Sequence, residues 1–245
     1  MTWRYKPAPD LGQSLADRLR RFPREPDLTV YGLRSLAALL MRGWLRLYHR
    51  LDIVGRENLP RQGSFVIVAN HTSHLDTLSL LAALPLRKLH RAFPAAAQDY
   101  FFVDVPRLAI AAVVINALPF GRQKQIRHSL DVCRELLANP GNVLILFPEG
   151  TRTTTGRMAE FKPGVGSLVA GTDLPVVPCH LAGGFEAWPK GNWIPRPRKL
   201  VLRIGRARSY SNLVPGREAA ESICAELQQA IAGLGNAQPN EGGSS

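Results

Sequence analysis

A histidine and an aspartate five positions apart, His71 and Asp76, follow an apolar run at 64–69. A neutral imidazole can remove a proton near neutral pH. A carboxylate hydrogen-bonded to its other ring nitrogen fixes the tautomer and stabilises the imidazolium. The spacing brings the two side chains together if His71 lies in a turn and Asp76 opens a helix. The pair therefore predicts a general base that could activate a hydroxyl group.

A second polar turn follows another apolar run, at 142–146, and consists of Phe-Pro-Glu-Gly-Thr-Arg at 147–152. An arginine such as Arg152 can bind a phosphate through two N–H groups, and Gly150 lets the backbone approach a ligand closely. In open α/β sheets, ligands bind where the carboxyl ends of the strands meet their loops. We therefore expect the two turns to form one site that binds an anionic substrate.

Other roles are open to the same residues. Ser73 and Asp76 have the spacing of a capping box, which would make Asp76 a structural residue at a helix start. His71 and His74 have a spacing that metal ligands can use, but no third ligand follows at metal-site spacing, so no metal site is predicted.

A covalent enzyme intermediate is not favoured by the sequence. The Gly-x-Ser-x-Gly motif of serine nucleophiles is absent. Cys179 and His180 are neighbours in a predicted strand, so their side chains point to opposite faces. The expected chemistry is direct attack by an activated hydroxyl, without a covalent enzyme intermediate.

These blocks resemble those of the glycerophospholipid acyltransferase family, of the 1-acyl-glycerol-3-phosphate acyltransferase type. The family pattern His-x-x-x-x-Asp is matched by His71 and Asp76, and its Phe-Pro-Glu-Gly-Thr-Arg block is matched in full at 147–152. A looser second block corresponds to 118–122, and a Val-Pro element to 176–178. The order and spacing agree over residues 50–210.

The resemblance implies transfer of a fatty acyl group from acyl-CoA or acyl carrier protein to the free hydroxyl of a lysophospholipid. It implies acceptor binding by Glu149, Gly150, Thr151 and Arg152, with Arg122 as a second cation. We expect Lys162 to be a further anion ligand. No cofactor is implied.

Lysophosphatidate is the default acceptor, but the second block reads Gly121-Arg122 and leaves the acceptor open. Glycerol 3-phosphate, another lysophospholipid and a lyso-aminolipid are alternatives. A lipid transacylase or hydrolase on the same scaffold, or a non-catalytic protein that binds anionic lipid, are the rival functions.

Charge favours an anionic partner. The formal net charge is +12 at pH 7, and residues 187–217 carry eight lysines and arginines with no acid. These cations either form a solvated face or bind anions. No nucleic-acid motif is present, so an anionic membrane surface is the expected partner. The three cysteines have no paired spacing, which favours free thiols in a reducing compartment.

An amphipathic helix is predicted over 29–51. A turn of about 100° per residue places four arginines on one half of the helix and an apolar set opposite. The arginines are Arg34, Arg42, Arg46 and Arg50, and the apolar set is Leu36, Leu40, Trp44, Leu47, Tyr48 and Leu51. Such a helix either lies in the membrane interface or packs on its own domain.

No signal peptide or membrane span is predicted, because residues 1–25 are polar and the apolar stretch 108–121 is shorter than the ~20 residues that a span requires. We read 108–121 as a buried strand and loop, or as part of an acyl pocket. The expected location is peripheral, on the cytoplasmic face of the membrane.

Strands and helices alternate after residue 50, which predicts an α/β fold: a single domain with a mixed, partly parallel central sheet flanked by helices. The predicted organisation is an amphipathic helical region at 1–50, an acyltransferase domain at 51–235 and a disordered tail at 236–245. The predicted strands are 51–54, 64–69, 92–97, 113–115, 143–147, 175–181 and 200–204. The predicted helices after residue 50 are 75–84, 124–138 and 218–234.

Overall fold

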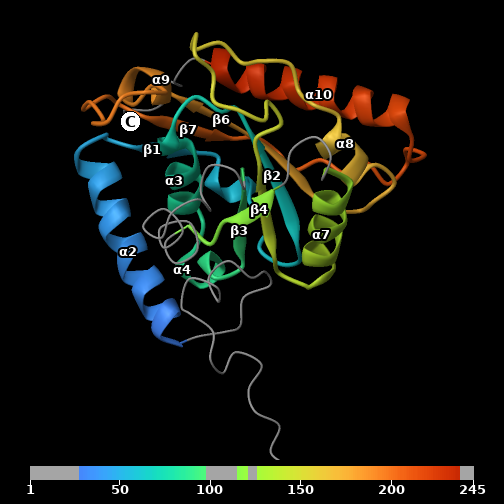
Figure 1. Cartoon of the computed structure of the whole chain (residues 1–245), viewed down its shortest axis with the longest axis horizontal. Helices are drawn as coiled ribbons and strands as arrows, with labels where there is room; N and C mark the ends of the chain where they lie inside the picture. The colour runs from blue at the N-terminus through green and yellow to red at the C-terminus, as the bar shows by residue number, and fades with distance from the viewer. Residues whose placement is uncertain (1–27, 98–114, 121–125, 238–245) are drawn as a thin grey trace, which may run out of the picture.

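A computed structural model describes residues 28–97, 115–120 and 126–237 of the chain (Figure 1). Its centre is a seven-stranded sheet with the order β1-β7-β6-β2-β5-β3-β4. The strands are β1 (Asp52–Val54), β2 (Phe65–Ala69), β3 (Ala92–Ala97), β4 (Leu118–Phe120), β5 (Val143–Leu146), β6 (Val176–Ala182) and β7 (Val201–Ile204).

The sheet is mixed, as the sequence predicts. Every neighbouring pair of strands is parallel except β6 and β7, which are antiparallel. Strand β2 lies in the middle, with β5 on one side and β6 on the other. Because β2 and β5 run in the same direction, with Val68 opposite Leu146, their carboxyl ends lie at the same edge of the sheet.

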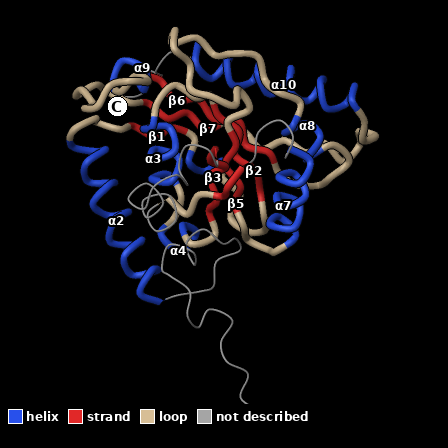
Figure 2. Tube along the Cα trace, viewed as in Figure 1, coloured by secondary structure: helices blue, strands red, loops and turns tan. Residues whose placement is uncertain are grey.

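Helices cover both faces of the sheet, as Figure 2 shows. Alternate residues of β2 belong to two separate apolar cores, which explains why all five of its positions are buried. Phe65, Ile67 and Ala69 pack with α2 (Leu28–Leu47), α3 (His74–Ala83) and α4 (Leu86–Leu89). Val66 and Val68 pack with α7, α8 and α10 on the other face. These last helices are α7 (Ile126–Ala138), α8 (Gly164–Val169) and α10 (Arg217–Asn236).

The predicted elements agree with the structure apart from a few short ones. The sequence predicts a strand at 113–115. Residue 115 is not part of a strand, and residues 113 and 114 lie outside the described residues. The nearest strand that the structure describes begins at Leu118. Two short helices, α4 and α8, were not predicted, and neither were the 3-10 turn η1 (Arg56–Asn58) and α9 (Gly184–Ala187). Residues 1–27 and 238–245 lie outside the described residues, and so does most of the predicted tail.

Helix α2 ends at Leu47, four residues before the predicted end at 51, and the predicted division into an arginine face and an apolar face is only partly present. Arg34 is only 4% exposed, and the Arg42 guanidinium donates a hydrogen bond to the carbonyl oxygen of Leu84 at the end of α3. Leu40 is 68% exposed and Leu47 82%. The four arginines therefore do not share one solvent face, since Arg34 and Arg42 turn toward the domain.

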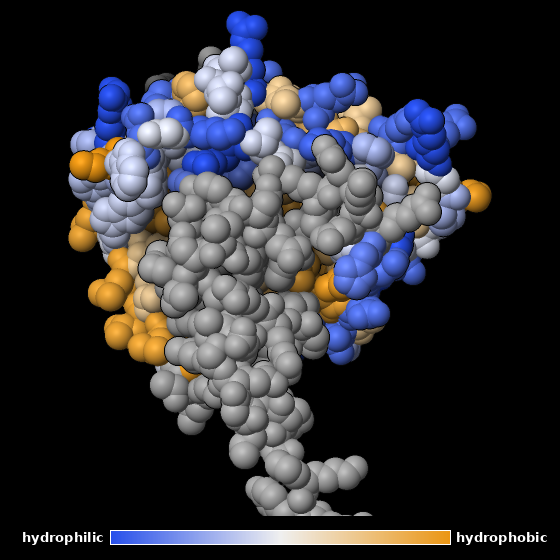
Figure 3. Space-filling view, in the orientation of Figure 1, coloured by the Kyte–Doolittle hydropathy of each residue, from blue (hydrophilic) through white to orange (hydrophobic). Residues whose placement is uncertain are grey.

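Arginines face inward because the inner side of α2 requires hydrogen-bond donors as well as residues that pack closely. Ala38 and Leu45 are buried and allow a close approach to α3. The last carbonyl groups of α3 have no partner within their own helix, so a long side chain that reaches them satisfies an orphan acceptor. Leu36, Leu39, Leu40 and Leu47 are left on the outer side, where Figure 3 shows apolar side chains gathered over α2. Among the described residues, no helix combines the length and the apolar character that crossing a bilayer requires.

Candidate active site

The two polar turns meet at the carboxyl edge of the sheet. The 70–73 segment leaves β2 and the 147–152 turn leaves β5, its parallel neighbour. Two backbone contacts join the turns. The Thr153 N–H donates to the His71 carbonyl oxygen at 2.9 Å, and the His71 N–H donates to Glu149 Oε1 at 2.6 Å. The sheet register therefore brings together residues that are about 75 positions apart in the sequence.

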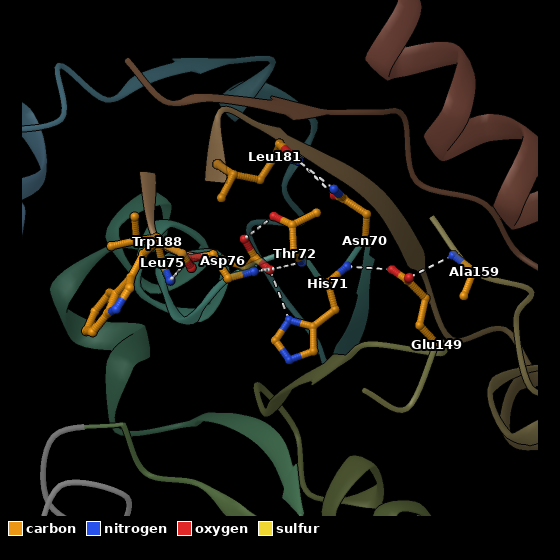
Figure 4. A network of polar contacts seen from close by, with 10 residues as sticks. Asn70, His71, Thr72, Leu75, Asp76, Glu149, Ala159, Leu181 and Trp188 are labelled. Atoms are coloured by element: carbon orange, nitrogen blue, oxygen red, sulfur yellow. Dashed lines mark hydrogen bonds and ion pairs between the residues drawn. The ribbon is translucent and has the colours of Figure 1, made fainter. Parts of the chain in front are cut away.

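His71 and Asp76 are in direct contact. His71 Nδ1 lies 2.9 Å from Asp76 Oδ2, in the arrangement of a histidine oriented by a carboxylate (Figure 4). Because Nδ1 faces the carboxylate, Nε2 is the nitrogen that would accept a proton. The imidazole stacks on the Phe147 ring, with centroids 4.1 Å apart and 17° between the planes, which fixes its orientation further.

Asp76 also caps α3, so the capping interpretation is confirmed for the same carboxylate that contacts His71. Asp76 is 1% exposed, and its Oδ2 accepts hydrogen bonds from the Thr72 and Ser73 N–H groups at 2.6 and 2.8 Å. The Thr72 hydroxyl donates to Oδ1 at 3.2 Å. The Ser73 hydroxyl completes the capping box by accepting from the Leu75 N–H. One carboxylate therefore closes the turn, starts the helix and orients the imidazole.

Asn70 fixes the turn to the neighbouring strand, a role that the sequence did not reveal. Its side chain donates to the Leu181 carbonyl oxygen at 3.0 Å and accepts from the Leu181 N–H at 2.8 Å. Both groups of the amide are thus used to hold the start of the turn against β6. The only available signal was a polar residue at the end of a fully apolar run.

A glycine pair after β6 was also missed. Gly184 opens α9 directly beside Thr72 and Asp76, and a Cβ atom there would lie 2.7 Å from Thr72 Oγ1 and 2.9 Å from Asp76 Oδ1. A side chain at this position would displace the hydrogen-bonded network. The Gly183-Gly184 pair was the signal that could have marked a close approach.

Glu149 is buried behind the histidine rather than open to a ligand. Its Oε1 accepts from the His71 N–H, and its Oε2 accepts from the Ala159 N–H at 2.8 Å. Burial raises the pKa of this carboxyl, and the two backbone donors oppose that shift. A carboxylate would also repel an acceptor phosphate. The geometry therefore favours a positioning role for Glu149 over the acceptor contact that the family resemblance implied.

The other expected anion ligands lie around Gly150. This glycine has a φ of 73°, which a residue with a side chain rarely adopts, and the Lys162 side chain packs directly over it. Thr151 is exposed and Arg152 is half-buried. Arg122 lies outside the described residues, so its expected place beside this turn remains a prediction.

A second histidine, His74, lies at the edge of the site. Its ring packs against the Trp188 ring, with centroids 5.4 Å apart. Burial, together with the positive charge of Arg152 and the nearby His71, lowers the pKa of His74 to about 4. His74 is therefore neutral at pH 7.

The cysteines are poor candidates for a nucleophile. All three are free and buried, and burial raises the pKa of the Cys133 thiol to about 12 and also raises those of Cys179 and Cys224. Within the described part of the chain, no group of three or more histidine, cysteine or acidic side chains is placed to hold a metal ion.

A family model described as acyltransferase matches residues 50–182, the segment that contains both turns. Since this is more than half of the chain, the protein belongs to the acyltransferase family. It is 33% identical over 192 residues to a 1-acyl-sn-glycerol-3-phosphate acyltransferase from Chlamydomonas reinhardtii, covering 76% of this chain and 53% of that protein. A protein of the same name from Pseudomonas aeruginosa is 29% identical over 160 residues, covering 64% of this chain and 59% of that one.

The chain spans about half the length of the algal and chloroplast relatives that it matches. Among solved structures, the 1-acyl-sn-glycerophosphate acyltransferase PlsC from Thermotoga maritima has the same fold. The TM-score is 0.61 at 23% identity, over 84% of this chain and 81% of that one.

The depressed pKa of His74 predicts a pH dependence of stability. An unfolded histidine takes up a proton below about pH 6.5, whereas folded His74 resists protonation down to about pH 4. The unfolded state therefore binds more protons in this window, and stability falls as the pH is lowered through it. Between pH 6.5 and 4.5, His74→Gln should remove up to about 2 kcal/mol of the loss seen in the wild type.

Denaturant unfolding of both proteins at these two pH values measures the difference. His49, His90 and His180, whose pKa values are also lowered by burial, are present in both proteins and cancel in the comparison. An equal loss of stability in both proteins would contradict the assignment.

Proposed function

We propose that this protein transfers a fatty acyl group from acyl-CoA or acyl carrier protein to the free hydroxyl of a lysophospholipid. The proposed acceptor is 1-acyl-glycerol 3-phosphate, and the product is phosphatidate. The observation that carries the proposal is the His71–Asp76 contact at the sheet edge, directly beside the turn that holds Arg152. The names of the related acyltransferases support the choice of acceptor.

The reaction needs a base and an acid at one position. The acceptor hydroxyl attacks the thioester carbonyl carbon while His71 Nε2 takes its proton. Asp76 stabilises the resulting imidazolium through the hydrogen bond to Nδ1. The tetrahedral intermediate then breaks its C–S bond, and the imidazolium returns the proton to the departing thiolate. No side chain carries the acyl group, which fits the burial of the three thiols.

Arg152 is the proposed phosphate ligand, with Lys162 beside it. A guanidinium can donate two parallel hydrogen bonds to phosphate oxygens, and the ammonium of Lys162 adds a second positive charge over Gly150. Thr151 and the backbone at Gly150 would approach the same phosphate, and Arg122 is proposed as a further cation. Glu149 would hold this turn and the histidine backbone at a fixed separation.

Three possible outcomes of one assay separate the proposed acyltransferase from a hydrolase and a transacylase. The full chain is incubated with labelled acyl-CoA or acyl carrier protein and with a panel of lysolipids and glycerol 3-phosphate. Labelled phosphatidate that depends on lysophosphatidate supports the proposal. Free fatty acid in the absence of an acceptor would indicate a hydrolase, and transfer from an intact lipid would indicate a transacylase.

We also propose that the protein works at the surface of an anionic membrane, on its cytoplasmic face. The support is the outer side of α2, where Leu36, Leu39, Leu40 and Leu47 are exposed while Arg34 and Arg42 face inward. An apolar helix face of this kind can be buried about 5–10 Å into the boundary between headgroups and acyl chains. The expected partner is therefore the bilayer that holds the acceptor lipid.

His71→Ala should lower kcat by ~10²–10⁴-fold, because the hydroxyl proton loses its acceptor. Asp76→Asn should also be severe, because an amide nitrogen cannot accept from the donors that surround this position. Both are measured with a short-chain, water-soluble lysophosphatidate, and circular dichroism checks the fold.

A folded His71→Ala protein that keeps more than about a tenth of the wild-type rate would exclude His71 as the base. Asp76→Ala with a lower melting temperature and a normal rate would leave Asp76 with its capping role alone.

Arg152→Ala should act on the acceptor. Loss of a charged hydrogen bond to phosphate in both ground and transition states should raise KM for lysophosphatidate about 10–100-fold and leave KM for the acyl donor nearly unchanged. Arg157→Ala is the matched control, since Arg157 is an exposed arginine of the same loop. A change confined to the donor KM would move Arg152 to the thioester side.

Replacing Leu36, Leu40 and Leu47 together with glutamine should release the protein from vesicles of phosphatidylglycerol and phosphatidylcholine. Each exposed leucine contributes about 1–2 kcal/mol on burial, so the loss of three should lower the partition constant at least about 100-fold. Thermal stability should hardly change. Arg34→Gln should do the opposite, lowering stability without a specific loss of vesicle binding, because Arg34 is buried. Equal vesicle binding by wild type and the leucine variant would remove α2 from the membrane proposal.

A further inference from the structure

The loop between α9 and β7, residues 188–199, presents two large apolar side chains to solvent. Trp193 is 93% exposed and Ile194 is 77% exposed. Indole rings normally bury 150–250 Å² in a core or an interface, so an almost fully exposed Trp-Ile pair indicates a partner. Neither residue takes part in the site described above.

Two hydrogen bonds fix the conformation of the loop. The Trp188 indole N–H donates to the Asn192 carbonyl oxygen at 2.8 Å, and the Arg196 N–H donates to the Ala187 carbonyl oxygen at 2.7 Å. Trp193 and Ile194 lie at the tip, between Asn192 and Arg196, which make these two hydrogen bonds. The structure thus presents the pair outward on a fixed base.

The base of the loop is joined to the end of α2, as its position beside α2 in Figure 1 shows. The Tyr48 hydroxyl donates to the Pro195 carbonyl oxygen at 3.0 Å, next to Leu47, which is the most exposed leucine of α2. His49 contacts the Arg198 carbonyl oxygen through Nδ1 at 3.3 Å. The tip of the loop is therefore continuous with the apolar side of α2.

Cations surround the tip. Lys190, Arg196, Arg198 and Lys199 are all exposed, and the sequence has no acid from 187 to 217. Trp combined with Lys and Arg is the composition found where proteins meet the headgroup region of a bilayer. Each cation near an anionic surface contributes about 1 kcal/mol, and salt weakens this contribution. Charge and apolar character together match an anionic bilayer.

The other end of the loop reaches the candidate active site. The Ser73 hydroxyl donates to the Trp188 carbonyl oxygen at 2.9 Å, and the Trp188 ring packs on His74. Ser73 caps the helix whose Asp76 orients His71. A short, hydrogen-bonded segment therefore connects the exposed tip to the catalytic turn.

We propose that residues 188–199 form a second membrane contact, in which Trp193 and Ile194 enter the headgroup region of an anionic bilayer and the neighbouring cations bind lipid phosphates. This rests on the proposed function in one respect, since it assigns the contact to the surface that holds the acceptor lipid. With α2 as the first contact, two separated contacts fix the orientation of the domain. Through Trp188, the second contact places the catalytic edge toward the bilayer.

The test compares three full-length proteins: wild type, W193S/I194S, and V214S as the matched control. Val214 is a similarly exposed apolar residue outside the loop, in the turn before α10. Binding to vesicles of 30% phosphatidylglycerol and 70% phosphatidylcholine is measured by co-sedimentation, with pure phosphatidylcholine vesicles as the reference. The loop variant should bind the anionic vesicles at least about tenfold more weakly, while V214S should bind like wild type.

A third variant, K190Q/R196Q/K199Q, should lose most of the preference for anionic over neutral vesicles and show a weaker dependence on salt. Sedimentation velocity tests the alternative that a second copy of the chain, and not a bilayer, covers the loop. A dimer of wild type that W193S/I194S converts to monomer, with unchanged vesicle binding, would overturn the proposal in favour of a second copy of the chain. Unchanged vesicle binding by a monomeric loop variant would overturn it as well.

Acyl transfer to a water-soluble, short-chain lysophosphatidate without vesicles separates the two proposals. The loop variant should keep the wild-type rate there. If the wild type has no transfer activity but the loop variant loses vesicle binding, the proposed function fails and the membrane contact stands. If the wild type has normal transfer activity but the loop variant binds vesicles as the wild type does, the proposed function stands and the membrane contact of the loop fails.

Discussion

The buried carboxylate of Asp76 is the interaction on which the rest of the site depends. It accepts from two backbone N–H groups and one hydroxyl, and it also lies against His71 Nδ1. A carboxylate buried to this extent is stable only where donors surround it, and the turn after β2 supplies them. The same geometry that starts α3 therefore fixes the imidazole. Helix capping and histidine orientation are one structure here, and a change in one cannot leave the other intact.

The sheet supplies the second constraint, because it determines which turns can meet. The parallel pairing of β2 with β5 places the 147–152 turn beside the histidine, and Glu149 ties the two together from beneath. On the other side of β2, Asn70 ties the same turn to β6 through Leu181. The turn that carries His71 is thus held from both neighbouring strands. This explains why buried polar residues gather here, although the surrounding core is apolar.

Helix α2 and the 188–199 loop, both at the surface, are hydrogen-bonded to the elements that hold the site. Helix α2 uses Arg42 to satisfy a carbonyl group at the end of α3, and this leaves its leucines outside. The 188–199 loop joins that apolar side at Tyr48 and reaches the capping serine of α3 through Trp188. The two proposed membrane contacts and the turn that carries His71 are consequently parts of one hydrogen-bonded framework. A lipid acceptor would then meet the base without leaving the surface of the bilayer.

The sequence by itself determined the local chemistry and the larger elements. Apolar runs, turn residues and the two motifs located most strands, the main helices, the mixed α/β sheet and the pairing of His71 with Asp76, because these depend on short-range spacing and pattern. Tertiary structure decided what depends on partners distant in the chain. The roles of Asn70 and Gly184 required Leu181 and Asp76 as neighbours, and the buried place of Glu149 required the backbone of His71. The inward turn of Arg34 and Arg42 was also decided there, since a helical pattern separates two faces but only packing against α3 and α4 selects which one is buried.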